Sequence, residues 1–199
     1  ECAVFPKTGH PPMDVESWRR IWRIYQNHGL NHARFHSWCP PDAAFSAADE
    51  LGIYLHVEAP IWMDGWMSAP NPRKEMDTPG YPKGLGLGDR TNDAFARAEI
   101  RRIIDTYGNH PSFVFFCIGN ELSTTDFRVT GEWMREAKQH DPRHLYAVST
   151  ARKLSKACEY NATHNIPDVG WCRQHVEFGT AWDYEKQYSR ARVPTIAHE

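Results

Sequence analysis

The sequence predicts an α/β fold built on a parallel sheet, and three observations lead to this prediction. Segments with helical periodicity alternate with short apolar segments along most of the 199 residues, an order typical of parallel strands joined by crossover helices. The run 113–118 is continuously apolar and follows a turn signal at 108–111, which indicates a strand buried on both faces. Two of the predicted strands end in a glutamate, at Glu121 and Glu199.

The first part of the chain predicts two helices, each followed by a strand. Segment 15–28 carries aromatic and aliphatic residues at helical spacing, and Asp14 before it is a good N-cap. Segment 32–36 predicts a short strand. A helix is expected over 42–51, ended by Gly52, and a strand over 53–59. A long loop rich in Pro, Gly, Trp and Met should follow at 60–90.

The second part continues the same alternation. Helices are expected at 92–107 and 130–140, with strands at 112–118 and 144–149. The stretch 150–181 shows little periodicity. A short helix is expected at 182–189 and a last strand at 193–198.

Composition limits the classes of function. The hydrophobic content of 41% is enough for one domain with a substantial core. The net charge of −2 does not favour nucleic acid or an anionic membrane as a partner, and no apolar run approaches the roughly 18 residues of a membrane span. The five cysteines form no CxxC pair and are expected to be free thiols. The eleven histidines lack the spacing of zinc enzymes, so neither a metal nor a cofactor is predicted.

The carboxylates at the strand ends are the strongest indication of chemistry. Glu121 ends a buried strand with Asn120 beside it, where packing alone would favour another aliphatic residue. Glu199 ends a second predicted inner strand. Retaining glycoside hydrolysis uses two such carboxylates, one as proton donor and then base, the other as nucleophile.

Three segments resemble glycoside hydrolase family 2, the family of β-galactosidases, β-glucuronidases and β-mannosidases. They are HPSFVFFCIGNE, which resembles the family's acid/base motif, GLNHARFHSWCPPDAAFSAADELGIYLHVEAP and VPTIAHE. The resemblance implies a (β/α)8 TIM barrel, which typically needs about 250 residues. We therefore expect 1–199 to be an incomplete catalytic barrel domain of a larger protein, lacking the first strand and the last strand and helix.

The resemblance also assigns roles to four residues. Glu121 would be the acid/base and Glu199 the nucleophile. Asn120 would hydrogen-bond the 2-hydroxyl of the sugar. Arg34, at the end of its strand, would lie near the nucleophile, where a fixed cation keeps a carboxylate ionised.

Further positions are expected to bind substrate on less specific grounds. Glu58 ends the third barrel strand and either pairs with Arg34 or binds a hydroxyl. Trp62 lies in the long loop and either lines a sugar subsite or packs the loop onto the barrel. The remaining candidates are His36, Tyr160, His164 and His198.

Taken together, these patterns predict a retaining glycosidase that acts on terminal β-glycosidic bonds of oligo- or polysaccharides, with carbohydrate as its partner. Two alternatives stay open: a non-catalytic carbohydrate-binding barrel or inactive fragment, and an inverting or endo-acting hydrolase on the same barrel. The distance between the two carboxyl groups distinguishes retaining from inverting enzymes. The sequence indicates neither the sugar nor the cellular compartment.

Overall fold

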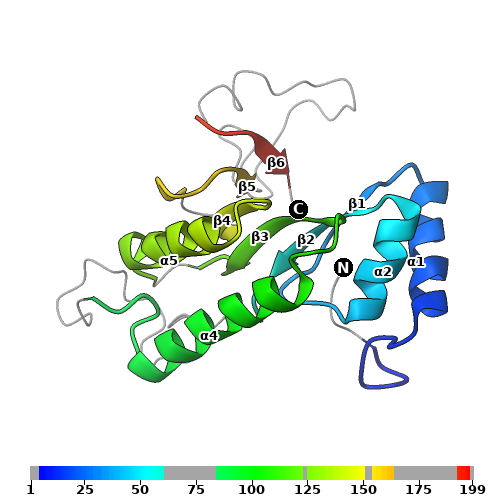
Figure 1. The fold of residues 1–199 in the computed structure, drawn as a ribbon, viewed down its shortest axis with the longest axis horizontal. Helices are drawn as coiled ribbons and strands as arrows, with labels where there is room; N and C mark the ends of the chain where they lie inside the picture. The colour runs from blue at the N-terminus through cyan, green and yellow to red at the C-terminus, as the bar shows by residue number, and fades with distance from the viewer. Residues whose placement is uncertain (1–4, 61–83, 123–124, 151–153, 164–191, 198–199) are drawn as a thin grey trace, which may run out of the picture.

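The computed structural model describes residues 5–60, 84–122, 125–150, 154–163 and 192–197. Its first elements are helix α1 (Val15–Asn27), strand β1 (His32–Arg34), helix α2 (Asp42–Leu51) and strand β2 (Tyr54–Glu58). Helix α4 (Arg90–Tyr107), strand β3 (Phe113–Asn120), helix α5 (Phe127–His140) and strand β4 (Leu145–Thr150) follow. Short strands β5 (Asn161–Thr163) and β6 (Thr195–Ala197) complete the described part (Figure 1).

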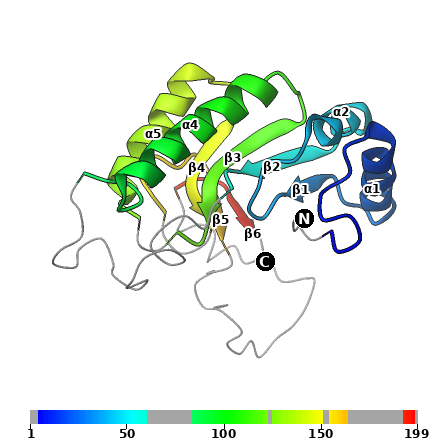
Figure 2. The same ribbon diagram turned by 90° about the horizontal axis from the view of Figure 1, so that it is seen from below.

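Strands β1 to β4 form a parallel sheet in the order of the sequence, and β5 and β6 form a second parallel pair. The register sets Arg34 beside His56, Glu58 beside Cys117 and Asn120 beside Thr150. Figure 2 shows the labelled helices along one side of the fanned sheet. The expected alternation and the parallel pairing of the 53–59 and 112–118 segments are thus confirmed.

Helices α1 and α2 pack against the sheet through aromatic residues and small residues. Trp18 and Trp22 of α1 are fully buried and contact each other and Phe35, which follows β1. The inner face of α2 is largely alanine, so α1 comes close enough for the Trp22 indole to donate to the Ala44 carbonyl at 3.0 Å. This packing fixes the position of β1, and with it the end of the strand that carries Arg34.

Helix α2 has the predicted bounds, and its C-cap Gly52 adopts the left-handed conformation with φ 69°. Helix α5 begins three residues before the predicted start, because the Asp126 carboxylate caps it by accepting from the N–H groups of Arg128 and Val129. Strand β3 runs two residues beyond its predicted end, because Gly119 and Asn120 keep pairing with β4. Asn120 is therefore part of the sheet.

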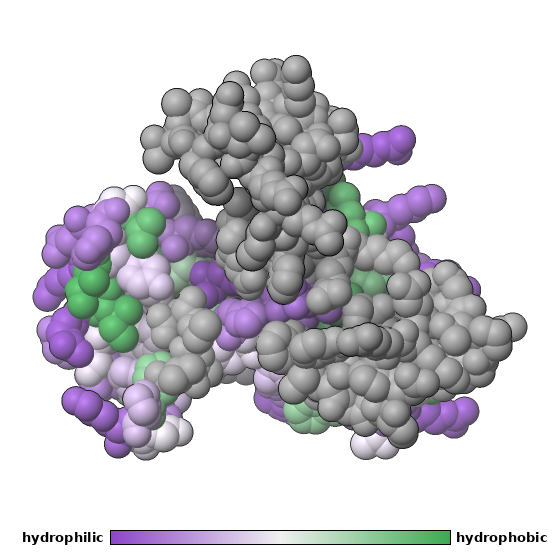
Figure 3. Space-filling model, turned by 180° about the vertical axis from the view of Figure 1, so that it is seen from behind, coloured by the Kyte–Doolittle hydropathy of each residue, from purple (hydrophilic) through white to green (hydrophobic). Residues whose placement is uncertain are grey.

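The described surface is mainly polar on the face in Figure 3, with apolar atoms exposed in a few places. Within the described ranges, the large hydrophobic residues that are exposed are Met13, Ile24, Leu30, Tyr54, Phe95 and Leu154. Of the helices described, none is long and apolar enough to span a bilayer. The helix expected at 182–189 and most of the loop expected at 60–90 lie outside the described residues.

Candidate active site

The carboxyl ends of strands β1 to β4 bring together polar residues that are far apart in the sequence. Parallel strands that neighbour each other end at the same edge of the sheet, which is where α/β barrels build their active sites. The residues that meet there are Arg34, Ser37, Glu58, Asn120, Glu121 and Thr150. Four of these six were predicted as site residues from the sequence.

Arg34 and Glu58 form a buried ion pair at this edge. The Arg34 Nε donates to Glu58 Oε1 at 2.8 Å, with side-chain exposures of 11% and 0%. The hydroxyl of Ser37 donates to the other carboxylate oxygen at 2.5 Å. Both oxygens of Glu58 are thus hydrogen-bonded and its charge is balanced by a cation, as a fully buried carboxylate requires. Of the two roles predicted for Glu58, the geometry supports the pairing with Arg34.

Asn120 joins the same network through its amide oxygen. The Arg34 Nη2 donates to Asn120 Oδ1 at 2.6 Å and to Thr150 Oγ1 at 3.0 Å, while the Thr150 hydroxyl donates to Asn120 Oδ1 at 2.9 Å. Asn120 and Thr150 are both buried. The guanidinium, the amide and the hydroxyl therefore hold one another in fixed orientations.

Glu121 stands at the end of β3 in an unusual backbone conformation. Its φ is 50°, and it is the one non-glycine residue in the described ranges with a positive φ. Its N–H donates to the Thr150 carbonyl at 2.9 Å, and the residue is partly exposed. The left-handed region costs a residue with a Cβ roughly 1–2 kcal/mol, and such strain gathers at functional sites. The strained turn leads the chain away from the strand at the acidic residue itself.

Tyr160, expected to contact substrate, lies instead in the interior. It is fully buried, with its hydroxyl 2.8 Å from Nε2 of His56 and donating to the Phe116 carbonyl at 3.1 Å. Burial raises the pKa of this phenol well above its usual value, so the hydroxyl stays protonated. Tyr160 joins the β5 segment to β2 and β3, a contact that favours a packing role.

The packing role of Tyr160 predicts a measurable effect on stability. Tyr160→Phe should lower the free energy of unfolding by about 1–3 kcal/mol, because His56 and the Phe116 carbonyl lose a buried partner. Urea denaturation measures the change, with Tyr54→Phe as control because Tyr54 is half exposed on β2. A loss no greater than in the control would contradict the role.

The other predicted residues are placed as follows. His36 follows β1 and is partly buried. Trp62, His164, His198 and Glu199 lie outside the described residues. The predicted pairing of Glu121 with Glu199 therefore stays a prediction, as do the substrate contacts of the three others.

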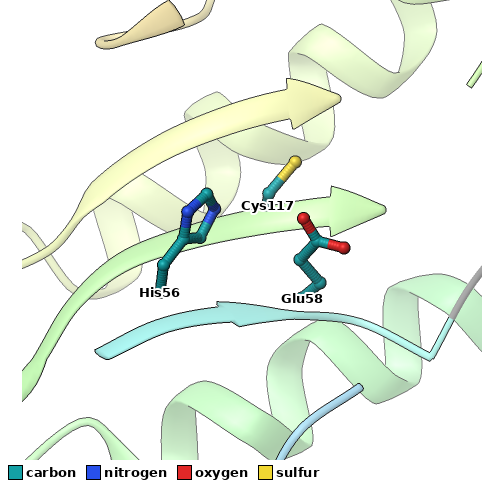
Figure 4. A group of neighbouring side chains, drawn as sticks. All are labelled: His56, Glu58 and Cys117. Carbon is teal, nitrogen blue, oxygen red and sulfur yellow. The ribbon is translucent and has the colours of Figure 1, made fainter. Parts of the chain in front are cut away.

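One group among the described residues has the composition of a metal site. His56, Glu58 and Cys117 are buried, and their potential ligand atoms lie within 4.8 Å of one another (Figure 4). However, two of these three potential ligands are in states that do not favour metal binding. Arg34 already balances the charge of Glu58, and burial raises the pKa of the Cys117 thiol well above its usual value, whereas metals bind the thiolate. This arrangement favours a charge-balanced polar interior over a bound cation.

Sequence reasoning missed Ser37 and Thr150. Thr150 was detectable, because it is a polar residue directly after the strand predicted at 144–149, the same pattern that singled out Glu121. Ser37 follows the strand end in an irregular segment, and no pattern in the sequence brings its hydroxyl to Glu58.

The sequence matches no protein-family model and no curated protein. Its fold is similar to that of several solved structures. The β-D-glucuronidase of Dictyoglomus thermophilum aligns with a TM-score of 0.60 and 19% identity, over 77% of this chain and 26% of that one. A β-glucuronidase of an uncultured Clostridium aligns with a TM-score of 0.61 and 15% identity, over 81% and 27%.

A third match is a glycosyl hydrolase family 2 member of Bacteroides cellulosilyticus, with a TM-score of 0.56 and 16% identity over 78% of this chain and 19% of that one. The chain thus spans about a fifth to a quarter of the length of the structures it matches. At these identities the likeness concerns the fold. In its parallel α/β fold, the chain resembles part of the glycoside hydrolase family 2 enzymes.

Proposed function

We propose that residues 1–199 are an incomplete catalytic (β/α)8-barrel domain of a glycosidase that cleaves terminal β-glycosidic bonds with retention of configuration. The observation that carries this proposal is the network at the carboxyl edge of the sheet. Arg34, Glu58 and Asn120 are held there by mutual hydrogen bonds, and Glu121 follows Asn120 directly in a strained conformation.

In the proposed mechanism, Glu121 protonates the oxygen of the leaving group and later deprotonates the attacking water. Glu199 attacks the anomeric carbon and forms the covalent glycosyl intermediate. Asn120 donates a hydrogen bond to the sugar 2-hydroxyl, which strengthens in the transition state. In this proposal Arg34 is the cation that supports the charge of the nucleophile. Retention requires the two carboxyl groups to lie roughly 5–5.5 Å apart.

The substrate class is a terminal β-glycoside. Two of the three structures described above are called β-glucuronidases, so a β-glucuronide is the first substrate to test, followed by a β-galactoside and a β-mannoside. Each is supplied as its 4-nitrophenyl glycoside to the full-length protein in which this chain occurs.

Product stereochemistry gives the decisive measurement. Proton NMR during hydrolysis should show the β-anomer of the released sugar first, with the α-anomer appearing only by mutarotation. If the α-anomer forms first, the enzyme inverts and the proposed role of Glu199 is wrong. Sugar binding without turnover of any of the three glycosides would indicate a carbohydrate-binding protein instead.

A further inference from the structure

We propose that Ser149 and Thr150, at the end of β4, are positioning residues for Asn120 and Glu121. This inference deepens the proposed function and rests on it. Strand β4 has no predicted role in the chemistry, yet its last two residues contact three consecutive residues at the end of β3. The contacts involve both side chains and the backbone.

The side chain of Thr150 sets the orientation of the Asn120 amide. A guanidinium has no acceptor, so the hydrogen bond from Arg34 Nη2 at 3.0 Å makes Thr150 Oγ1 the acceptor there. The hydroxyl proton is then directed to Asn120 Oδ1, 2.9 Å away, which also accepts from Arg34. With two donors facing its oxygen, the amide turns its NH2 group away from Arg34 and Thr150. Asn120 is thereby prepared to donate to a sugar hydroxyl.

The backbone and the neighbouring serine hold the acidic residue. The Thr150 carbonyl accepts from the Glu121 N–H at 2.9 Å and from the Ser149 hydroxyl at 2.9 Å. The same serine oxygen accepts from the Leu122 N–H at 2.9 Å. The N–H groups at Glu121 and directly after it are thus both fixed to β4. These two hydrogen bonds hold the backbone of Glu121 at φ 50°. Without them, glutamate would adopt a less strained conformation.

Packing alone does not require these hydroxyls. Ser149 and Thr150 are buried, and valine would fill the space of a threonine in a strand equally well. What valine lacks is the hydroxyl that accepts from Arg34 and donates to Asn120. Together with Arg34, the threonine therefore fixes which end of the amide, the oxygen or the NH2 group, is presented to a ligand. This property affects binding of the 2-hydroxyl more than stability.

The test compares two substrates: the 4-nitrophenyl β-glycoside that the full-length protein turns over fastest, and its 2-deoxy analogue. Thr150→Val should lower kcat/KM for the glycoside about 10–100-fold, since misplaced groups in active sites cause losses of this size. The 2-deoxy analogue has no hydroxyl for Asn120 to bind, so its kcat/KM should change little. Thr150→Ser keeps the hydroxyl and should restore most of the preference for the 2-hydroxy substrate.

Thr130→Val is the matched control. Thr130 is fully buried in α5 and donates to the Asp126 carbonyl at 2.9 Å, outside the network at the strand ends. It should leave the ratio of the two kcat/KM values unchanged. If Thr150→Val slows both substrates equally, or changes the ratio no more than Thr130→Val does, the inference is overturned.

A second measurement separates this inference from the proposed function. Hydrogen exchange at the Leu122 amide should be faster in Ser149→Ala, because its acceptor is removed. Unchanged exchange contradicts the positioning role whether or not the protein hydrolyses glycosides. Faster exchange in a protein that hydrolyses none of the three glycosides supports the contact and refutes the proposed function alone.

Discussion

Glu121→Gln should slow hydrolysis of a methyl β-glycoside by about 10²–10⁴-fold, the usual contribution of a general acid. A 2,4-dinitrophenyl β-glycoside should lose far less in its glycosylation step, because dinitrophenolate departs without protonation. The two variants needed are isosteric: Glu121→Gln and Glu199→Gln, each in the full-length protein. The measurement is the rate of the first turnover against the pKa of the leaving group.

Glu199→Gln should abolish turnover of both substrates, because it removes the group that attacks the anomeric carbon. The contrast between the variants assigns the roles more firmly than either rate alone. Glu159→Gln serves as control, since Glu159 pairs with Lys138 and accepts from the Tyr146 N–H near the start of β4, away from the network at the strand ends. Equal slowing of both substrates by Glu121→Gln, or residual turnover in Glu199→Gln, would show that acid and nucleophile are wrongly assigned.

Glu58→Gln should destabilise the protein by about 3–5 kcal/mol, the usual cost of removing one partner from a buried ion pair. The substitution keeps the shape but leaves Arg34, which is 11% exposed, without the carboxylate that balances its charge. It also weakens the hydrogen bond from Ser37. Urea denaturation at neutral pH gives the free energy of unfolding.

The surface offers a matched control for this change. Glu136 pairs with Arg97 at 2.7 Å, but the side chains are 57% and 54% exposed. Glu136→Gln should cost at most about 1 kcal/mol, because water already screens the pair. Similar losses in the two variants would mean that the Arg34–Glu58 pair contributes no more than a surface contact.

The fold was predictable because its signals are local. Each helix and strand shows its own periodicity, and Gly52 and Asp14 mark helix ends through backbone and side-chain preferences that need no tertiary context. The predicted end of β3 was wrong because a distant segment decides it: β3 extends to Asn120 because β4 continues to pair with it. The predicted start of α5 was wrong for a different reason, because the N-cap Asp126 is a local signal that the prediction overlooked.

The difference between local and distant signals also applies to the candidate active site. Arg34, Glu58, Asn120 and Glu121 were recognisable because each is a polar residue at the end of an apolar strand. Tyr160 was misjudged because its partners, His56 and the Phe116 carbonyl, lie 104 and 44 positions away in the sequence. No local pattern in the sequence distinguishes a tyrosine that binds sugar from one that packs in the protein interior.

At Glu121 the proposed role and the conformational preference of the residue favour different amino acids, because its φ is positive. Glycine adopts φ near 50° without penalty, whereas glutamate does not. A descendant protein released from selection for hydrolysis would gain stability by replacing this residue, and that change should be among the first it accumulates. The identity of this one residue would then mark whether such a lineage has lost the proposed activity.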